Sequence, residues 1–267
     1  MRDHPEADSL IATAHALAEA ARAATLRHFR SAALSVQDKG QGGFDPVTVA
    51  DREAEAAMRA VLAERRPRDG ILGEEMDDVA GETGLTWVLD PIDGTRGFMS
   101  GTPTWGVLIA VSDAQGPLYG VIDQPHIGER FEGGLGRTEL TGPGGARALC
   151  TRPPRPLDRA ILFSTYPEVG SPAESAAFAA LSDRVQLTRY GLDCYAYALV
   201  ALGQVDLVVE AGLHPYDIHA PIAVIQAAGG IVTDWRGGPA HGGGRVIAAA
   251  NPEVHAAALD ILSAAAG

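Results

Sequence analysis

Near the start of the chain, hydrophobic residues recur at the spacing of amphipathic helices. Leu10–Phe29 is alanine-rich, with apolar residues three and four positions apart, which predicts a helix with one buried face. Thr48–Glu64 predicts a second helix with Thr48 as its N-cap, and Pro67–Gly70 ends it. The segment between the two helices, Gly40–Gly43, predicts a flexible loop.

Farther along, the pattern changes to short apolar runs separated by turn residues, which predicts strands. These strands are Leu85–Leu89, Trp105–Val111, Leu118–Ile122 and Arg130–Glu132, with a hairpin turn at Asp113–Pro117. The proline-rich segment Arg152–Pro156 then marks a boundary, so we expect one half over residues 1–150 and a second over 151–267.

The second half alternates between strands and helices. The predicted strands are Ala160–Phe163, Val185–Thr188, Val205–Glu210 and two near Ile231 and Val246. The predicted helices are Ala173–Leu181, Cys194–Leu202, Tyr216–Ala228 and a last one after Pro252. Mixed elements that begin with a run of antiparallel-type strands predict a layered α+β fold.

Composition narrows the function classes. The chain has 267 residues, 46% of them hydrophobic, and 34 acidic against 21 basic residues give a formal net charge of −13. This balance disfavours nucleic acid and anionic membranes as partners and favours divalent cations. Cys150 and Cys194 have no metal-ligand spacing, and Met1–Leu10 is too polar for a signal peptide. We therefore expect a cytoplasmic protein with no disulfide and no membrane span.

Four acidic clusters are candidates for a cation site. They are Asp45–Asp51, Gly73–Glu75, Asp90–Thr95 and Pro215–Asp217. In the third, a buried strand surfaces at Asp90, where an unpaired carboxylate is costly. Asp93 precedes Gly94 and Thr95, which favour a tight turn that opens a helix. Asp90, the Ile92 carbonyl and Asp93 could then hold one hard cation such as Mg²⁺.

The same turn is a candidate phosphate site. Main-chain N–H groups at a helix start bind phosphate, and Gly94 has no side chain to block the approach. The combined segment therefore predicts metal ligands and a phosphate cradle formed by Gly94 and Thr95.

Each cluster taken alone also has a structural explanation. Asp-Pro and Asp-Gly are common in turns, and Asp93 or Asp217 could simply cap a helix. Asp51 and the Glu74–Glu75 pair could lie on the surface. Other chemistries lack their motifs, because the chain has no G-x-S-x-G elbow, no P-loop and no H-E-x-x-H.

In order along the chain, Gly73-Glu74-Glu75, Asp90-Pro91-Ile92-Asp93-Gly94-Thr95 and Asp217 resemble the inositol monophosphatase superfamily of Mg²⁺-dependent, lithium-sensitive phosphatases. The resemblance covers nearly the whole chain. It implies a layered α-β-α-β-α sandwich, commonly dimeric, so we expect a homodimer. It also implies two or three Mg²⁺ ions and a small phosphorylated metabolite as substrate.

The resemblance also assigns roles to individual residues. The metal ligands it implies are Glu74, Asp90, the Ile92 carbonyl, Asp93, Asp217 and, for a weaker third ion, Asp51. Thr95, with a metal and an acidic partner, would orient the attacking water, and Glu74, Asp51 and Thr95 are the catalytic residues that the resemblance implies. Lys39, the only lysine, lies near the family's loop lysine, although its spacing from the next motif is looser.

Within the superfamily, the chain is most similar to the histidinol-phosphate phosphatase branch. The residues that carry this similarity are Asp123-Gln124-Pro125, Glu129-Arg130, Arg189–Tyr197 and Ile231–Trp235. Histidinol phosphate carries an ammonium group and an imidazole, which Asp193 and Glu210 would complement. Asp193 could equally be the N-cap of the helix that follows it. We also expect Arg189 and Ser164 in this pocket.

Three functions follow from these residues. The first is hydrolysis of histidinol phosphate by direct in-line attack of water. The second is hydrolysis of inositol-1-phosphate or a broader range of sugar phosphates on the same scaffold. The third is a non-catalytic metal-binding or regulatory homologue, which the retention of every matched acid and of Thr95 disfavours.

Overall fold

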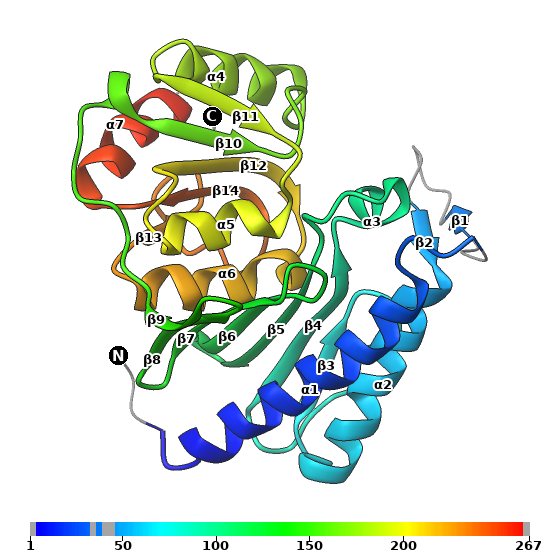
Figure 1. The fold of residues 1–267 in the computed structure, drawn as a ribbon. Coiled ribbons are helices and arrows are strands. Elements are labelled where there is room, and N and C mark those ends of the chain that lie inside the picture. The colour runs from blue at the N-terminus through cyan, green and yellow to red at the C-terminus, as the bar shows by residue number, and fades with distance from the viewer. Residues whose placement is uncertain (1–3, 33–35, 39–45, 264–267) are drawn as a thin grey trace.

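Layers of helix and sheet alternate through the molecule (Figure 1). The computed structural model describes residues 4–32, 36–38 and 46–263, so Lys39, Asp45 and the loop predicted at Gly40–Gly43 lie outside the described residues. The helices are α1 (Ala7–His28), α2 (Val49–Arg65), α3 (Thr95–Ser100), α4 (Pro172–Ser182), α5 (Cys194–Ala201), α6 (Pro215–Ala227) and α7 (Pro252–Leu262), with a short 3₁₀ helix at Leu157–Arg159.

The first sheet has seven strands in their chain order. They are β3 (Gly70–Gly73), β4 (Thr86–Asp93), β5 (Gly106–Asp113), β6 (Gly116–Gln124), β7 (Glu129–Gly134), β8 (Arg137–Gly142) and β9 (Gly145–Ala148). The β3–β4 pair is parallel and the other pairs are antiparallel. A separate antiparallel pair is formed by β1 (Val36–Asp38) and β2 (Pro46–Thr48).

The second sheet has five strands in the order β11-β10-β12-β14-β13. Their bounds are β10 (Ile161–Ser164), β11 (Leu187–Tyr190), β12 (Leu207–Leu213), β13 (Ile231–Thr233) and β14 (Gly244–Ala249). The pairs β10–β11 and β10–β12 are parallel, and β14 runs antiparallel to both β12 and β13.

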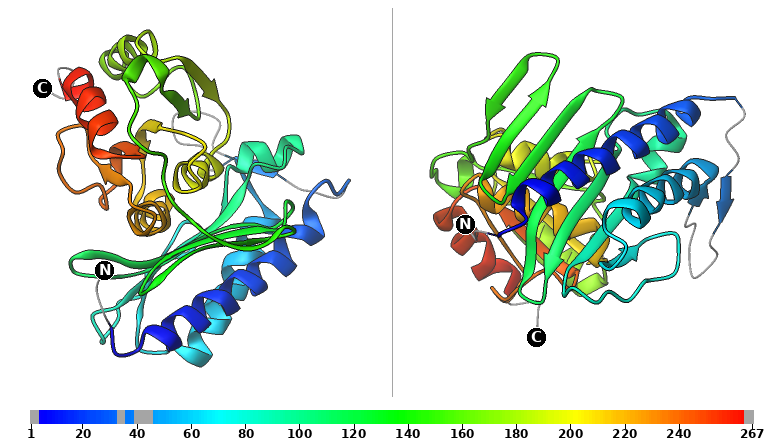
Figure 2. Two further views of the ribbon diagram at one scale, coloured as in Figure 1. Left: turned by 60° about the vertical axis from the view of Figure 1, so that its left-hand side comes forward. Right: turned by 90° about the horizontal axis from the view of Figure 1, so that it is seen from below.

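Separate hydrophobic cores hold the layers together. One lies between α1, α2 and the first sheet, and includes Leu17, Met58 and Trp87. The second joins the first sheet to α5, α6 and the second sheet, and the third lies between the second sheet and α4 and α7. Figure 2 shows α1 and α2 together on one face of the first sheet. The arrangement is the α-β-α-β-α sandwich that the family resemblance implies.

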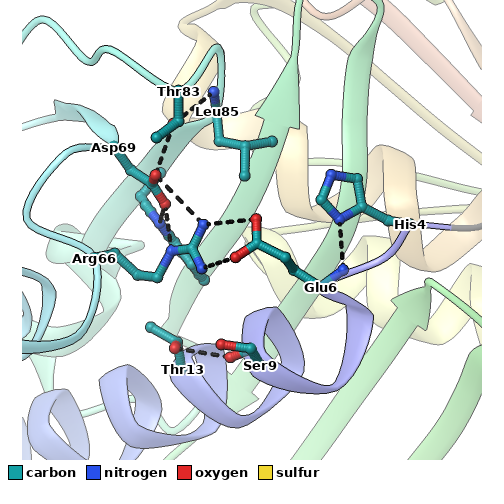
Figure 3. A network of polar contacts seen from close by, with 9 residues as sticks. His4, Glu6, Ser9, Thr13, Arg66, Asp69, Thr83 and Leu85 are labelled. Carbon is teal, nitrogen blue, oxygen red and sulfur yellow. Dashed lines mark hydrogen bonds and ion pairs between the residues drawn. The ribbon is translucent and has the colours of Figure 1, made fainter.

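A polar network fixes the start of α1 against the first sheet (Figure 3). Arg66 donates to Glu6 and to the buried carboxylate of Asp69, at 2.8 and 2.7 Å. Thr83 and the Trp87 indole also donate to Asp69, at 2.7 and 3.0 Å. The oxygens of Asp69 are therefore satisfied away from water, as a buried charge requires.

Most of the predicted elements are present, within a few residues at their ends. Thr48 caps α2 as predicted, and Asp113 pairs with Gly116 in the predicted hairpin. The sequence pattern did not predict β1, β2, β3, β8 or β9, because these segments are short or rich in glycine and polar residues. Among the described residues no helix has the length and apolarity to span a bilayer.

The proposed halves correspond to the two sheets, since residues up to Ala148 build the first and residues from Ile161 build the second. However, α5 and α6 from the second half pack directly on the first sheet. The division into two domains therefore stays a prediction.

Candidate metal centre

The carboxylates of Asp90 and Asp93 come together at the end of β4 because the strand is irregular there. The pairing of β4 with β5 shifts register between Asp90 and Asp93. The Ile92 N–H donates to Asp90 Oδ1 at 3.0 Å and closes a small turn. The Ile92 side chain packs with Ala50, Phe98 and Trp105 in a small buried cluster, which anchors the turn.

Asp217 joins this pair from the first turn of α6. One carboxylate oxygen each from Asp90, Asp93 and Asp217 lies within 4.8 Å of the others. Asp217 also caps its own helix, because the His214 N–H donates to Asp217 Oδ2 at 2.6 Å. The capping role considered from the sequence and a place in the acidic cluster thus coexist in one side chain.

Asp93 caps a helix as well, but not the one that follows it in sequence. Its Oδ2 accepts a hydrogen bond from the main-chain N–H of Cys194, at 2.5 Å, where α5 begins. This bond connects the end of β4 in the first sheet to a helix of the second half.

Glu74 lies beside the cluster, directly after β3. Its main-chain N–H donates to Leu89 O at 3.3 Å, which holds it next to β4. The pKa of Asp90 is raised well above its usual value by burial and then by the charges of Glu74, Asp93 and Asp217. Burial and the charge of Asp217 also raise the pKa of Asp93 to about 7.

These raised pKa values indicate that the cluster is unfavourable when all of its carboxyl groups are ionised. Several like charges held in a buried position repel one another, and a bound divalent cation removes that repulsion. All the donors are oxygen atoms, which suits Mg²⁺ and not the softer metals that prefer thiolate or imidazole. The residues present therefore fit a hard divalent cation.

Asp51 and Thr95 form a second polar group next to the cluster. Thr95 Oγ1 lies 3.1 Å from Ile92 O and 3.4 Å from Asp51 Oδ1. Asp51 is fully buried and receives the Thr48 main-chain N–H at 2.9 Å in a capping box. The alternative that Asp51 lies on the helix surface is therefore wrong.

Gly94 precedes α3 with φ 85° and ψ 42°, in the left-handed region. A Cβ atom here would lie 2.7 Å from Asp193 Oδ2, so the close approach of Asp193 depends on glycine. The N–H groups of the first turn of α3 have no partner within the helix.

Asp193 and Glu210 lie on the second half's side of this turn. Asp193 has a φ of 48° and makes no side-chain capping bond to α5, so the helix-cap alternative fails. Burial and the charge of Asp93 raise the pKa of Asp193 to about 7, against the opposing charge of Arg96. Burial raises the pKa of Glu210 to about 8, although Thr165 donates to it at 2.8 and 2.9 Å.

A sequence model of the inositol monophosphatase family matches residues 6–265. The chain belongs to this family. It is 42% identical over 235 residues to the bifunctional phosphatase IMPL2 of Arabidopsis thaliana, a match that covers 87% of this chain and 66% of that one. It is 37% identical to a histidinol-phosphatase of Mycobacterium tuberculosis, over 93% of this chain and 96% of the relative.

A solved structure supports the same assignment. The fold superposes on an inositol monophosphatase from Zymomonas mobilis with a TM-score of 0.83, at 36% identity, covering 97% of this chain and 99% of that chain. The α+β sandwich predicted from the sequence is thus confirmed as that of the inositol monophosphatase family.

The structure brings together most of the residues that the family resemblance singles out. Asp90, Asp93 and Asp217 meet, with Glu74, Asp51, Thr95 and Gly94 around them. Ser164 Oγ lies 3.4 Å from Glu210 Oε2, so these two predicted pocket residues are neighbours. Arg189 is exposed on β11, and no described contact joins it to the acidic cluster. Its role in substrate binding stays a prediction.

The residues that indicate the histidinol-phosphate branch of the family contact one another. Gln124 Nε2 donates to Cys194 Sγ at 3.4 Å, and the Tyr195 hydroxyl donates to Glu129 at 2.8 Å. Asp123 forms a buried ion pair with Arg130 at 2.8 Å. The Gln124–Cys194 and Tyr195–Glu129 contacts join α5 to the first sheet, whereas the Asp123–Arg130 pair joins β6 to β7.

Sequence reasoning missed several neighbours of the site. Arg96 donates to the Tyr166 hydroxyl and lies over its ring at 5.2 Å, so it joins α3 to the loop after β10. The Cys194 main-chain N–H and the Thr165 hydroxyl also contact site acids. A main-chain donor leaves no signal in the sequence, whereas Arg96, next to Thr95, could have been flagged by its position.

Proposed function

We propose that this protein is a Mg²⁺-dependent phosphoric monoester hydrolase and that its substrate is histidinol phosphate. The observation that supports the chemistry is the meeting of the buried Asp90 with the half-buried Asp93 and Asp217 beside the turn at Gly94. Uncatalysed hydrolysis of phosphate monoesters is so slow that accelerations of up to about 10²¹-fold are needed. A site that gathers cations against a phosphate is suited to provide them.

Asp90, Asp93 and Asp217, together with Glu74 and the Ile92 carbonyl, would hold two Mg²⁺ ions, and Asp51 would contribute to a third. Bound there, the ions would neutralise the phosphoryl oxygens, lower the pKa of the attacking water and stabilise the leaving alkoxide. The N–H groups at Gly94 and Thr95 would bind the phosphate, whose charge is favoured at a helix start.

Thr95 would orient the attacking water. Its hydroxyl proton has two acceptors, Ile92 O at 3.1 Å and Asp51 Oδ1 at 3.4 Å, and donation to either leaves the oxygen lone pairs able to accept a hydrogen bond from a water molecule. In-line attack then forms one P–O bond to that water as the bond to the leaving alkoxide breaks. We expect no phospho-enzyme, because burial and the charge of Asp93 raise the pKa of the nearby Cys194 thiol well above its usual value.

The proposed substrate follows from the acids on the far side of the turn. Asp193 lies against Gly94, and Glu210 lies beside Ser164. Two carboxyl groups next to a phosphate site complement a leaving group that carries an ammonium and an imidazole. A polyol leaving group such as inositol offers only hydroxyls and gives these acids no charge to neutralise.

Phosphate release from purified protein in Mg²⁺ tests this proposal. The panel should include histidinol phosphate, inositol-1-phosphate, fructose bisphosphate and nucleoside monophosphates. We expect the highest kcat/KM for histidinol phosphate. A higher value for inositol-1-phosphate would favour the second function, which the likeness to the Zymomonas mobilis enzyme supports. No release from any monoester would favour a non-catalytic homologue.

Asp193→Asn separates the two phosphatase functions further. If Asp193 binds the substrate's cationic group, the variant should lower kcat/KM for histidinol phosphate by about tenfold and leave kcat/KM for inositol-1-phosphate nearly unchanged. An equal loss on both substrates would show that Asp193 only shapes the backbone at the start of α5.

A further inference from the structure

Tyr197 is a buried tyrosine whose hydroxyl lacks a partner. Its side chain belongs to α5 and only 4% of the residue is exposed. Among the described residues, none forms a hydrogen bond with the Tyr197 hydroxyl. Tyr195, two positions earlier in the same helix, donates its hydroxyl to Glu129 at 2.8 Å. A buried phenol normally finds such a partner, because an unmade hydrogen bond in the interior is unfavourable.

The position of Tyr197 relates it to the candidate site. It lies one helical turn after Cys194, whose N–H binds Asp93. It belongs to the same hydrophobic core as Ile218, the residue that follows Asp217. Burial, and then the charges of Glu210, Asp93 and Asp217, raise the pKa of the phenol well above its usual value. The helix α5 packs against β12, and Val208, two residues before Glu210 on that strand, belongs to the same core as Tyr197, so Glu210 lies on the face of β12 that Val208 shares with α5.

Glu210 has an oxygen that can accept a further hydrogen bond. Its Oε1 receives both the main-chain N–H and the hydroxyl of Thr165. Its Oε2 has only the 3.4 Å contact with Ser164 Oγ, a hydroxyl that also lies 3.2 Å from Tyr166 O. Because one hydroxyl has one proton, Ser164 cannot donate fully to both acceptors.

We propose that Tyr197 is a positioning residue whose hydroxyl donates a hydrogen bond to Oε2 of Glu210 when substrate is bound, and so holds that carboxylate against the cationic leaving group. The proposal rests on the proposed function of the site. A carboxylate fixed by a bound cation is a charge-assisted acceptor, which explains why a polar hydroxyl is kept in an otherwise apolar position. Phenylalanine would fill the same space without an unpaired donor.

Tyr197→Phe tests the proposal, with Tyr195→Phe as a matched control on the same helix. Removing the unpaired Tyr197 hydroxyl should leave the melting temperature of the substrate-free protein equal to or above that of the wild type. It should raise KM for histidinol phosphate about tenfold while kcat stays within about twofold. Tyr195→Phe should instead lower the melting temperature, and any loss of activity should be equal for all monoesters.

A double-mutant cycle with Glu210→Gln identifies the partner of the hydroxyl. If Tyr197 acts through Glu210, the double variant should have the same KM as Glu210→Gln alone. Independent, multiplying effects would overturn the proposal. So would a Tyr197→Phe variant with a lower melting temperature and equal losses of kcat on all substrates, because that pattern indicates a structural role only.

The cycle also separates this inference from the proposed function. It is run with histidinol phosphate even if the wild-type protein prefers another monoester, because the Tyr197–Glu210 coupling is expected only with a cationic leaving group; a different preference would then correct the substrate alone. If the wild type hydrolyses no monoester, the proposed function fails. The Tyr197 proposal then fails only if thermal shifts with histidinol, the dephosphorylated amino alcohol, are equal for wild type and Tyr197→Phe.

Discussion

Asp93 experiences two opposite influences. Burial and the charge of Asp217 raise its pKa to about 7, whereas the Cys194 N–H stabilises its ionised form. A carboxylate held in this balance is poised to lose its proton when a cation arrives. A metal bound by Asp93 would thus be coupled to the placement of α5.

We expect Asp93→Asn to reduce kcat/KM at least about a hundredfold while the fold is retained. The amide oxygen can still accept from the Cys194 N–H, but it contributes no charge to a cation. Phosphate release and circular dichroism measure the two parts of this prediction. Near-normal turnover would remove Asp93 from the set of ligands.

Gly94→Ala should lower both stability and activity. The residue would have to keep a φ of 85° with a Cβ atom 2.7 Å from Asp193 Oδ2. The left-handed conformation alone costs about 1–2 kcal/mol for a residue with a side chain. Thermal unfolding should show this loss, and Gly84→Ala, which meets no atom within 4 Å at a φ of 80°, controls for the conformation alone.

Part of the candidate site could be predicted from local spacing, whereas Glu74, Asp51 and Asp217 were assigned by the family resemblance. Asp90 and Asp93 fall at the end of an apolar strand, and Gly94 marks the turn. What could not be predicted is how residues far apart in sequence pair across layers. The contacts of Asp93 with Cys194, and of Gly94 with Asp193, depend on the packing of the two sheets around α5 and α6.

At the scale of elements, the acids of the site also serve as helix caps. Asp51 completes the capping box of α2 and Asp217 that of α6, while Asp93 accepts the first N–H of α5. Each helix presents the positive end of its dipole to a carboxylate. The positions of these helices and of the site carboxylates are therefore coupled, and a substitution that removes a cap should also disturb the site.

Thr48→Ala tests this coupling on α2. Thr48 donates its main-chain N–H and its hydroxyl to Asp51 Oδ2, and its Oγ1 accepts from the Ala50 N–H at 3.1 Å. Loss of the cap should cost about 1 kcal/mol of unfolding free energy. It should also raise the Mg²⁺ concentration needed for half-maximal activity, since Asp51 loses one of the two hydrogen bonds that Thr48 donates to it. Thr48→Ser should restore both, and a loss that serine fails to rescue would argue against the cap.

The strands β8 and β9 escaped prediction for the same reason. The strand β9 is exposed along its whole length, and β8 is exposed or half-buried except at Leu140. Neither shows the clean alternation that marks a half-covered strand. Their pairing comes from the hairpin connections Gly134–Arg137 and Gly142–Gly145 and not from a hydrophobic pattern.

For the whole molecule, the acidic cluster makes stability depend on pH and on cations together. Asp93 and Glu210 have folded-state pKa values of about 7 and about 8, above the roughly 4 of an unfolded chain. Their contribution is fully present below the unfolded pKa and is lost as pH rises through the folded values. Asp69 and Glu132 act in reverse. Although burial opposes it, hydrogen bonds lower their pKa, so their contribution is lost in acid.

Metal-free protein should therefore be most stable at about pH 4–5, just above the unfolded carboxyl pKa, and should lose stability progressively toward pH 8. Saturating Mg²⁺ should remove most of the alkaline loss, because it binds the ionised acids. Thermal unfolding in a chelator and in Mg²⁺, from pH 4 to pH 9, measures this. A chelated protein with one melting temperature between pH 5 and pH 9 would contradict it, and Asp93→Asn should flatten the profile.

Asp90 and Asp93 precede the boundary near residue 150, and Asp217 follows it. An ion bound by all three would cross-link the segments of the chain before and after this boundary. If the chain were divided within the Arg152–Pro156 segment, each of the two fragments would contain an incomplete set of these carboxylate ligands. The two fragments should bind each other with higher affinity when magnesium is present. The change in that affinity would measure how much the ion contributes to holding the two sheets together.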